Sequence, residues 1–279
     1  TDRTVQTIHH QDPFLPFPVR LHLGPPRMPI GAARNLGVKL ARAPLVAFVS
    51  ADAEIEPDWV AHAMASLETT DMAFGPQVHA PQQWSVAAAV RGLRYQFPRG
   101  PTATPLRFAS NVAAAYRKPV LLRFPFEPGA NAAEDLLLAI RAKATGHAVT
   151  YAPGMVVRHR DVGSLRQELR KNLREGAGCG RYAAELGVQW PVLAWGALLA
   201  AAATLPFFNL AWGLAALAGV LWLPALRRGL RHRKDMPARH LMAGVAASPP
   251  FDLAFLVQYL RGLLGARRHA RQRSKEIPA

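Results

Sequence analysis

The chain has 279 residues, of which 50% are hydrophobic, and it carries a formal net charge of +16. This length is sufficient for one sizeable domain with additional elements, and the single cysteine, Cys179, excludes an internal disulfide and suits a reducing compartment. The basic residues lack interleaved aromatic platforms and no nucleic-acid-binding motif is present, so we do not expect a nucleic-acid partner.

The first part of the chain predicts alternating strands and helices. Residues 19–24 predict a strand, and residues 31–43 predict a helix that Pro44 ends. The apolar run 45–49 predicts a strand buried on both faces. A helix then opens at Pro57, and its core face is predicted to carry Trp59, Val60, Ala63, Met64 and Leu67. Further along, the pattern predicts a strand at 72–78, a helix at about 83–96 and a small-residue segment at 108–116.

Small residues and carboxylates follow the strand at 45–49, in the order Ser50-Ala51-Asp52-Ala53-Glu54. Ligands of open α/β sheets bind beyond the carboxyl ends of the strands, which makes Asp52 a candidate ligand-binding residue. The alternative is that Asp52 and Glu54 start the next helix and complement its dipole.

A second helix signal covers residues 131–146. Asn131 is a suitable N-cap, Glu134 has the capping-box spacing from it, and Gly146 fits the position after the helix end. Asp135 has no evident local partner, so it is a candidate for accepting a proton. The alternative is that both acids are solvated partners of the helix dipole.

His159 ends the short strands predicted between residues 147 and 157. It therefore holds the same kind of position in the chain as Asp52, after an apolar strand. A carboxylate oxygen and an imidazole nitrogen can together hold a divalent cation, although a lone histidine is more often a packed residue.

Together these segments resemble the family-2 glycosyltransferases, which have a GT-A fold. Arg34-Asn35-Leu36-Gly37 before a strand is similar to the family pattern ARNxG, and Ser50-Ala51-Asp52 is similar to its Asp-x-Asp motif. The segments 111–117 and 134–159 resemble N-x-A-x-R and EDxxLxxRxxxxGxxxxYxPxxxVxH. The likeness covers roughly residues 1–185, and the order and spacing of the motifs make it specific.

The resemblance implies an α/β, GT-A-like (Rossmann-like), mostly parallel sheet with helices on both faces. Two departures from the family pattern stand out. The opening βαβ unit is missing from the sequence, and Ser50 replaces the first Asp of the Asp-x-Asp motif. A serine can still bond a ribose hydroxyl, but the loss of a carboxylate lowers the expected metal affinity.

The implied chemistry is inverting transfer of a sugar from a nucleotide-diphosphate sugar. The resemblance implies Asp135 as catalytic base, and Mg²⁺ or Mn²⁺ held by Asp52 and His159. The implied substrate-binding residues are Arg34, Asn35, Ser50, Ala51, Asp52, Asn111, Glu134 and Arg174. Basic residues after the domain, Arg170, Lys171, Arg174 and Arg181, are candidates for the diphosphate, and a lipid-headgroup patch is an equally good interpretation of them.

The C-terminal part of the chain is typical of a membrane protein. Residues 186–226 contain no charged residue, whereas residues 166–279 as a whole carry 17 Lys and Arg against 6 Asp and Glu. We expect two membrane helices, at about 190–206 and 210–226, joined at Pro206–Asn209 as a hairpin. Basic flanks on both sides place both ends in the cytoplasm. A helix at about 251–264 is expected to lie in the membrane interface, and a third span is the alternative.

These interpretations give four segments: a catalytic domain (1–165), a basic amphipathic segment (166–188), two membrane helices (189–227), and a basic C-terminal segment (228–279). The expected function is transfer of the sugar to a lipid-linked or surface-saccharide acceptor. The site would face the cytoplasm in a multi-pass protein of the cytoplasmic membrane, with membrane lipids as partners. The alternative is a non-catalytic membrane relative that keeps the scaffold for binding or assembly.

Overall fold

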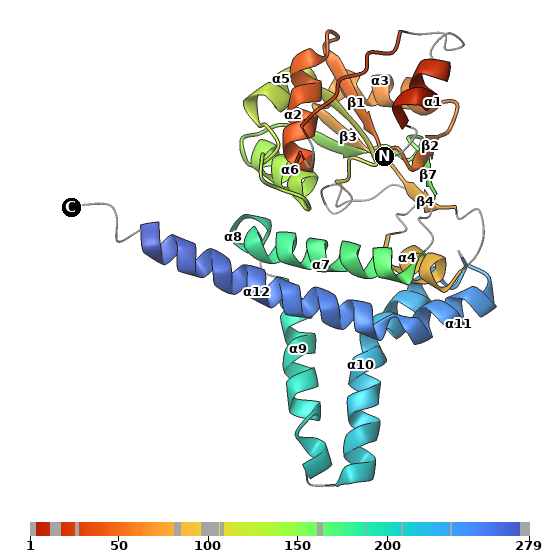
Figure 1. Cartoon of the computed structure of the whole chain (residues 1–279), viewed down its shortest axis with the longest axis vertical. Helices are drawn as coiled ribbons and strands as arrows, with labels where there is room; N and C mark the ends of the chain where they lie inside the picture. The colour runs from red at the N-terminus through yellow and green to blue at the C-terminus, as the bar shows by residue number, and fades with distance from the viewer. Residues whose placement is uncertain are drawn as a thin grey trace.

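The computed structural model describes residues 4–11, 18–25, 28–80, 85–95, 106, 109–160, 164–187, 189–207, 209–234 and 236–273. Figure 1 shows an α/β domain above a platform of long helices, from which a helical pair projects. The elements of the α/β domain are α1 (Thr4–Gln11), α2 (Ile30–Leu40), β1 (Leu45–Val49), β2 (Ala53–Ile55), α3 (Trp59–Thr69), β3 (Met72–Phe74), β4 (Gln77–His79), β5 (Ala113–Arg117), α5 (Lys118–Arg123), α6 (Glu134–Ala144), β6 (Val149–Tyr151) and β7 (Val157–His159). The remaining elements are α4 (Val86–Tyr95), α7 (Leu165–Arg181), α8 (Ala183–Leu186), α9 (Trp190–Ala202), η3 (Leu205–Phe207), α10 (Leu210–His232), α11 (Ala238–Ala247) and α12 (Pro249–Arg273).

The main sheet has the strand order β1-β5-β3-β6 and is mixed, so the prediction of a mostly parallel sheet is wrong for the described strands. β5 runs antiparallel to both β1 and β3, and β3 and β6 are parallel. The residues of β5 up to Tyr116 are buried, so its sequence reads as an apolar run. Such a run indicates burial on two faces but carries no information about strand direction.

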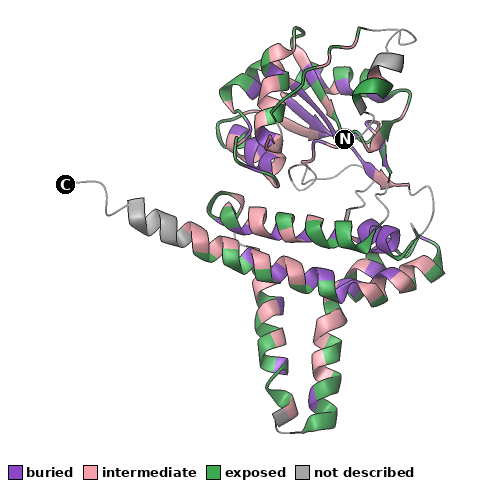
Figure 2. Cartoon of the chain, viewed as in Figure 1, coloured by how far each residue is buried: buried purple, intermediate pink, exposed green. Residues whose placement is uncertain are grey.

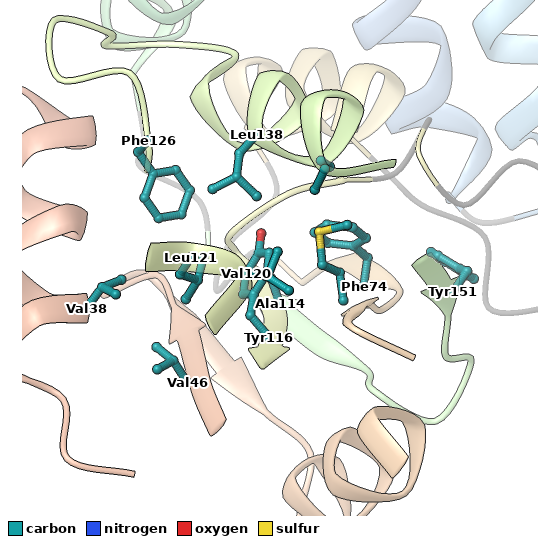
Figure 3. Close-up of a cluster of buried hydrophobic side chains, with 13 residues drawn as sticks. Val38, Val46, Phe74, Ala114, Tyr116, Val120, Leu121, Phe126, Leu138 and Tyr151 are labelled. Atoms are coloured by element: carbon teal, nitrogen blue, oxygen red, sulfur yellow. The ribbon is translucent and has the colours of Figure 1, made fainter. Parts of the chain in front are cut away.

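Helices cover both faces of this sheet, as predicted. Alternate residues of β5 point to opposite faces. Ala114 and Tyr116 pack with residues of α2, α5 and α6, among them Leu138, in the cluster that Figure 3 shows. Ala113 and Ala115 pack on the other face against Trp59 and its neighbours on α3.

Several predicted elements differ in detail. None of the described residues 18–25 is in a strand, although residues 19–24 predict one. On α3, Val60 and Met64 are more than half exposed, because this helix buries a narrower stripe than predicted. The strand predicted at 72–78 is divided into β3 and β4 at Gly75, where a Cβ atom would lie 2.0 Å from the Met155 carbonyl oxygen. The close backbone approach at this point therefore requires glycine.

Three strands form a second, smaller sheet in the order β2-β7-β4. β2 and β7 are antiparallel, with Ala53 opposite His159, and β4 and β7 are parallel. A turn in which the Ala53 N–H donates to the Ser50 carbonyl (3.0 Å) leads from β1 into β2. This turn carries Asp52 out of the main sheet and towards the end of β7.

The platform consists mainly of α7 and α12, which lie against each other along much of their length (Figure 1). Glycines permit this close approach. A Cβ atom at Gly180 would lie 2.1 Å from the Tyr259 carbonyl oxygen, and one at Gly176 would lie 2.5 Å from that of Phe255. Small residues four positions apart are the usual device for bringing helix backbones together.

The helices α9 and α10 extend away from the platform, and their residues are mostly exposed or half-exposed (Figure 2). Among the described residues α10 is the one single helix long and apolar enough to cross a membrane. The pair of α11 and α12, bent by 44°, passes the same test when its two helices are taken together. α9 has 13 residues and ends at Ala202, so it is shorter than the span predicted at 190–206. The transmembrane hairpin therefore stays a prediction.

One hydrogen bond joins α9 to α10 at a proline. Pro224 lies inside α10 and has no N–H, so it cannot satisfy the carbonyl of Val220 four residues earlier. The indole Nε1 of Trp195 on α9 donates to this carbonyl at 2.7 Å. The side chain of Trp195 is almost fully buried and thereby fixes the distance between the two helices.

Candidate active site

A cavity of about 400 Å³ lies between the α/β domain and the platform. The domain contributes the start of α6, Arg34 on α2 and the segment before β5, and the platform contributes residues of α7 and Phe255 of α12. Of the residues predicted to bind substrate, to bind the diphosphate or to act as the base, five line this cavity: Arg34, Glu134, Asp135, Lys171 and Arg174.

Asp135 is fixed by two main-chain donors. Its carboxylate accepts the N–H of Asn111 at 3.0 Å and the N–H of Leu136 at 2.9 Å. The expectation that Asp135 lacks a local partner is therefore wrong. Its side chain is half-buried at the cavity wall, which leaves one face of the carboxylate accessible to a ligand.

The start of α6 differs from the predicted capping box. The helix begins at Glu134, and its cap position is Ala133, which has a left-handed backbone (φ 65°) and makes no side-chain cap bond. Asn131 is exposed and is not the N-cap. Non-glycine residues in this conformation carry local strain, and such strain often lies next to functional groups.

Glu134 is buried and forms an ion pair with Arg34, which ties α6 to α2. Burial raises the pKa of Glu134, and the neighbouring carboxylate of Asp135 acts in the same direction, whereas Arg34 opposes the shift. The Arg34 guanidinium also lies 5.7 Å from the ring centroid of Phe126 and 6.0 Å from that of Phe48. The pair shapes the cavity wall in place of capping the helix.

The structure gives Asn35 and Asn111 architectural roles. Asn35 donates to the Phe126 carbonyl at 2.7 Å and accepts the Phe126 N–H at 2.9 Å, so both polar atoms of its side chain are engaged. Asn111 is 1% exposed, and its Oδ1 accepts the hydroxyl of Tyr116 at 2.7 Å. Neither side chain lines the 400 Å³ cavity, and the substrate contacts predicted for them stay predictions. Burial, reinforced by nearby Asp135, raises the pKa of Tyr116, so this hydroxyl stays a donor.

Asp52 and His159 lie side by side, as the register of β2 and β7 requires. The Asp52 Oδ2 atom is 3.4 Å from the His159 Nε2 atom, and the Asp52 carbonyl accepts the N–H of Arg160 at 2.7 Å. His159 is buried, whereas the side chain of Asp52 is 40% exposed. Neither lines the 400 Å³ cavity, and neither do Ser50 and Ala51 in the preceding turn. Within the described part of the chain no three His, Cys, Asp or Glu residues form a metal-binding group.

Comparison with known proteins identifies the first part of the chain. Residues 1–123 match the model of the family described as glycosyl transferase family 2. The match covers 123 of the 279 residues, which is less than half of the chain. A search of curated proteins finds no match.

Among solved structures, the chain is similar to the mannosyltransferase PcManGT from Pyrobaculum calidifontis in complex with GDP-Man and Mn²⁺. The identity is 17%, the TM-score is 0.53, and the match covers 93% of this chain and 75% of the other. TarS from S. aureus, residues 1–349 in complex with UDP-GlcNAc, matches with 12% identity, a TM-score of 0.44, and coverage of 98% and 80%. The first score supports a shared GT-A-like fold, and the second is too low to support an argument.

The matched segment therefore carries the sequence pattern of a glycosyltransferase. The family match ends before α6 and α7, so the cavity joins residues inside the matched segment, such as Arg34, to residues beyond it, such as Asp135 and Arg174. The candidate roles of Asp135, His159 and Arg174 therefore rest on where the structure places these residues, because the family match does not reach them.

Two cavity residues on α7, Glu175 and Cys179, were missed by sequence reasoning. The Nζ atom of Lys171 lies 3.9 Å from a Glu175 oxygen one helical turn away. Burial lowers the pKa of Lys171, while the carboxylates of Glu175, Glu168 and Asp52 oppose this shift. Burial raises the pKa of Cys179 to about 12, so its thiol stays protonated and is no nucleophile. The sequence feature that could have identified them is the spacing of residues 171, 174, 175 and 179, which places these residues on one face of a helix.

Proposed function

We propose that this glycosyltransferase moves a sugar from a nucleotide-diphosphate sugar to a lipid-linked or surface-saccharide acceptor, with inversion at the anomeric carbon. The observation that supports this proposal best is the carboxylate of Asp135, which two main-chain N–H groups hold at the wall of a cavity that also contains cationic side chains. A fixed carboxylate next to bound substrate is the arrangement that general-base catalysis needs.

In the proposed reaction the acceptor hydroxyl attacks the anomeric carbon and gives its proton to Asp135. A new C–O bond forms as the bond to the diphosphate oxygen breaks, and the bonding electron pair leaves with the nucleotide diphosphate. Arg174 is exposed at the cavity, and among the described residues no ion pair is recorded for it. It is therefore well placed to bind the negative charge of the leaving group.

Asp52 and His159 fit a divalent cation as an incomplete ligand set, because an oxygen and a nitrogen ligand lie 3.4 Å apart at the rim of the domain. We propose that these two residues hold Mg²⁺ or Mn²⁺ together with diphosphate oxygens, since Mg²⁺ commonly combines few protein ligands with substrate phosphates. A cation held by these residues would supply positive charge that stabilises the diphosphate as a leaving group. Ser50 and Ala51 stay candidates for contacts to the nucleotide.

The membrane arrangement completes the proposal. We propose that α9 and α10 cross the cytoplasmic membrane as a hairpin, that both ends stay in the cytoplasm, and that α12 lies along the interface. Exposed apolar side chains on α9 and α10, such as Leu198, Trp212 and Leu214, support this placement, as do the basic residues on both sides of the hairpin. The active site then faces an acceptor at the membrane surface.

The test is turnover of nucleotide sugars by the full-length protein in lipid nanodiscs. We expect Asp135→Asn to lower kcat by about 100-fold or more, with little change in the affinity for the nucleotide diphosphate. Asp58→Asn, at an exposed aspartate before α3, is the matched control and should keep full activity. Full activity of the Asp135→Asn variant would remove the base from the proposed mechanism.

A second candidate function is a non-catalytic membrane protein that keeps the scaffold. One observation favours it, because Asp52 and His159 do not line the cavity that contains Asp135. Calorimetry with nucleotide diphosphates and Mn²⁺ distinguishes the two functions. Absence of binding at millimolar ligand supports the non-catalytic function, and metal-dependent binding supports the enzyme.

A further inference from the structure

A second cavity, of about 540 Å³, lies where the helical pair α9 and α10 meets the platform. We call it the arginine cavity, because four arginines line it: Arg94, Arg227, Arg228 and Arg231. One acidic residue, Asp252 at the start of α12, accompanies them. The cavity therefore has a marked excess of positive charge.

Asp252 cannot neutralise all four arginines. Its Oδ1 atom pairs with Arg94 and its Oδ2 atom pairs with Arg228, and the aspartate is only 6% exposed. Within the described residues no ion pair is recorded for Arg227 or Arg231, which are exposed and lie one turn apart on α10. Like charges at this spacing repel each other, so the pair favours an anion that bridges them.

The remainder of the arginine cavity is apolar. Pro191 and Trp195 of α9 face Leu223 of α10 across it, and Phe255 of α12 completes the wall. The bond from Trp195 to the carbonyl that Pro224 leaves free holds this wall in place before any ligand arrives. Leu223 and the neighbouring Leu226 are each 48% exposed, so the apolar part continues onto the outer surface of α10.

A cationic end next to an apolar wall that continues along an apolar helix matches an amphipathic anion, and it does not match a soluble phosphate compound. We propose that the arginine cavity binds the phosphate group of an anionic lipid. Arg227 and Arg231 contact the phosphate, and the first part of the lipid chain lies against Trp195 and Leu223. Guanidinium groups bind phosphate oxygens through pairs of parallel, charge-assisted hydrogen bonds.

The arginine cavity also adjoins the candidate active site, because the side chain of Phe255 lines both cavities. The Arg94 guanidinium lies 5.7 Å from the ring centroid of Phe255. The proposed lipid site and the cavity of Asp135 therefore share Phe255 in their walls. This inference deepens the proposed function and rests on its membrane placement, since it names the chemistry of a lipid that binds beside the active site.

The test measures binding of a short-chain phosphatidic acid to the full-length protein in a neutral detergent, with phosphatidylcholine of the same chain length and free pyrophosphate as comparison ligands. We expect phosphatidic acid to bind best. The variant Arg227→Gln/Arg231→Gln should weaken its binding about tenfold or more. The control variant Arg233→Gln/Lys234→Gln removes the same charge from the same end of α10 outside the arginine cavity, and it should change binding less than twofold.

Two results would overturn the assignment. An equal loss of affinity in both variants would show general attraction to a basic surface, and tight binding of pyrophosphate without binding of phosphatidic acid would show a soluble ligand. The Asp135→Asn variant separates this inference from the proposed function, because it should keep wild-type binding of phosphatidic acid. A protein that binds this lipid but turns over no nucleotide sugar would refute the proposed function and leave the lipid site intact.

Discussion

The contact between α7 and α12 makes a quantitative prediction for the substitution Gly180→Ala. A Cβ atom at this position would lie 2.1 Å from the Tyr259 carbonyl oxygen and 3.0 Å from the Leu263 nitrogen. These are main-chain atoms that no rotamer change can move, so α12 has to shift by about 1 Å in a closely packed interface. Overpacking of this kind costs about 1–3 kcal/mol, and the gain in helix propensity from glycine to alanine returns about 1 kcal/mol. We expect a net loss of stability of up to about 2 kcal/mol.

Gly265→Ala is the matched control, because it lies on α12 and a Cβ atom there would have no neighbour within 4 Å. This variant should gain about 1 kcal/mol from helix propensity alone. The assay is thermal unfolding of both variants in the same lipid nanodiscs. The melting temperatures should differ by several degrees, with Gly265→Ala the higher. If Gly180→Ala is as stable as Gly265→Ala, the two helices do not pack backbone to backbone and this reasoning is refuted.

Three further predictions concern single contacts, all measured by thermal unfolding. Trp195→Phe should cost about 1–3 kcal/mol, because it leaves a partly buried carbonyl of α10 without a donor, whereas Trp212→Phe on the exposed surface should have little effect. Ala133→Gly should stabilise the protein by up to about 1 kcal/mol by relieving the left-handed strain, and a clear loss would contradict the observed backbone. The hydrogen bond from Arg141 to Glu185 (2.6 Å) lowers the pKa of Glu185 below its usual 4.5, so the stabilisation is present above pH 4.5 and is lost as the pH falls through the lowered value. The melting temperatures of wild type and Glu185→Gln should therefore converge in acid, and a constant difference would show that the pair does not titrate.

Local sequence patterns predicted most of the helices and strands, but they did not predict the direction in which each strand runs in the sheet. The apolar run 45–49 and the periodic pattern around residues 134–144 correspond to β1 and α6. The prediction that β1 is buried on both faces is wrong, because β1 is an edge strand of the described sheet in which Val46 alone is buried and Val49 is 43% exposed. The antiparallel direction of β5 leaves no trace in the sequence, because an apolar strand buried between two neighbours has the same composition in either direction.

Sequence patterns could select single residues of the candidate site, but they could not reveal contacts between residues that lie far apart in the chain. Asp135 was selected because the sequence offers no evident local partner for it; it does line the cavity, but its carboxylate accepts two main-chain N–H groups that the sequence did not reveal, and its role as base stays a prediction. Glu134 was assigned a cap because its true partner, Arg34, lies 100 residues earlier in the chain. Asn35 carries a family motif, but its amide fixes the main chain of Phe126, and a motif alone does not distinguish these uses.

The cavity at Asp135 takes one of its sides from α7, which also packs along α12 and so connects to the helices proposed to enter the membrane. A soluble fragment that stops before Leu165 would keep Asp135 but lose Lys171 and Arg174. Such a fragment would lack the α7 side of the cavity. The wall of the cavity and the helices proposed to enter the membrane thus share one pair of packed helices, so a substitution that separates α7 from α12 should also disturb the surroundings of Asp135.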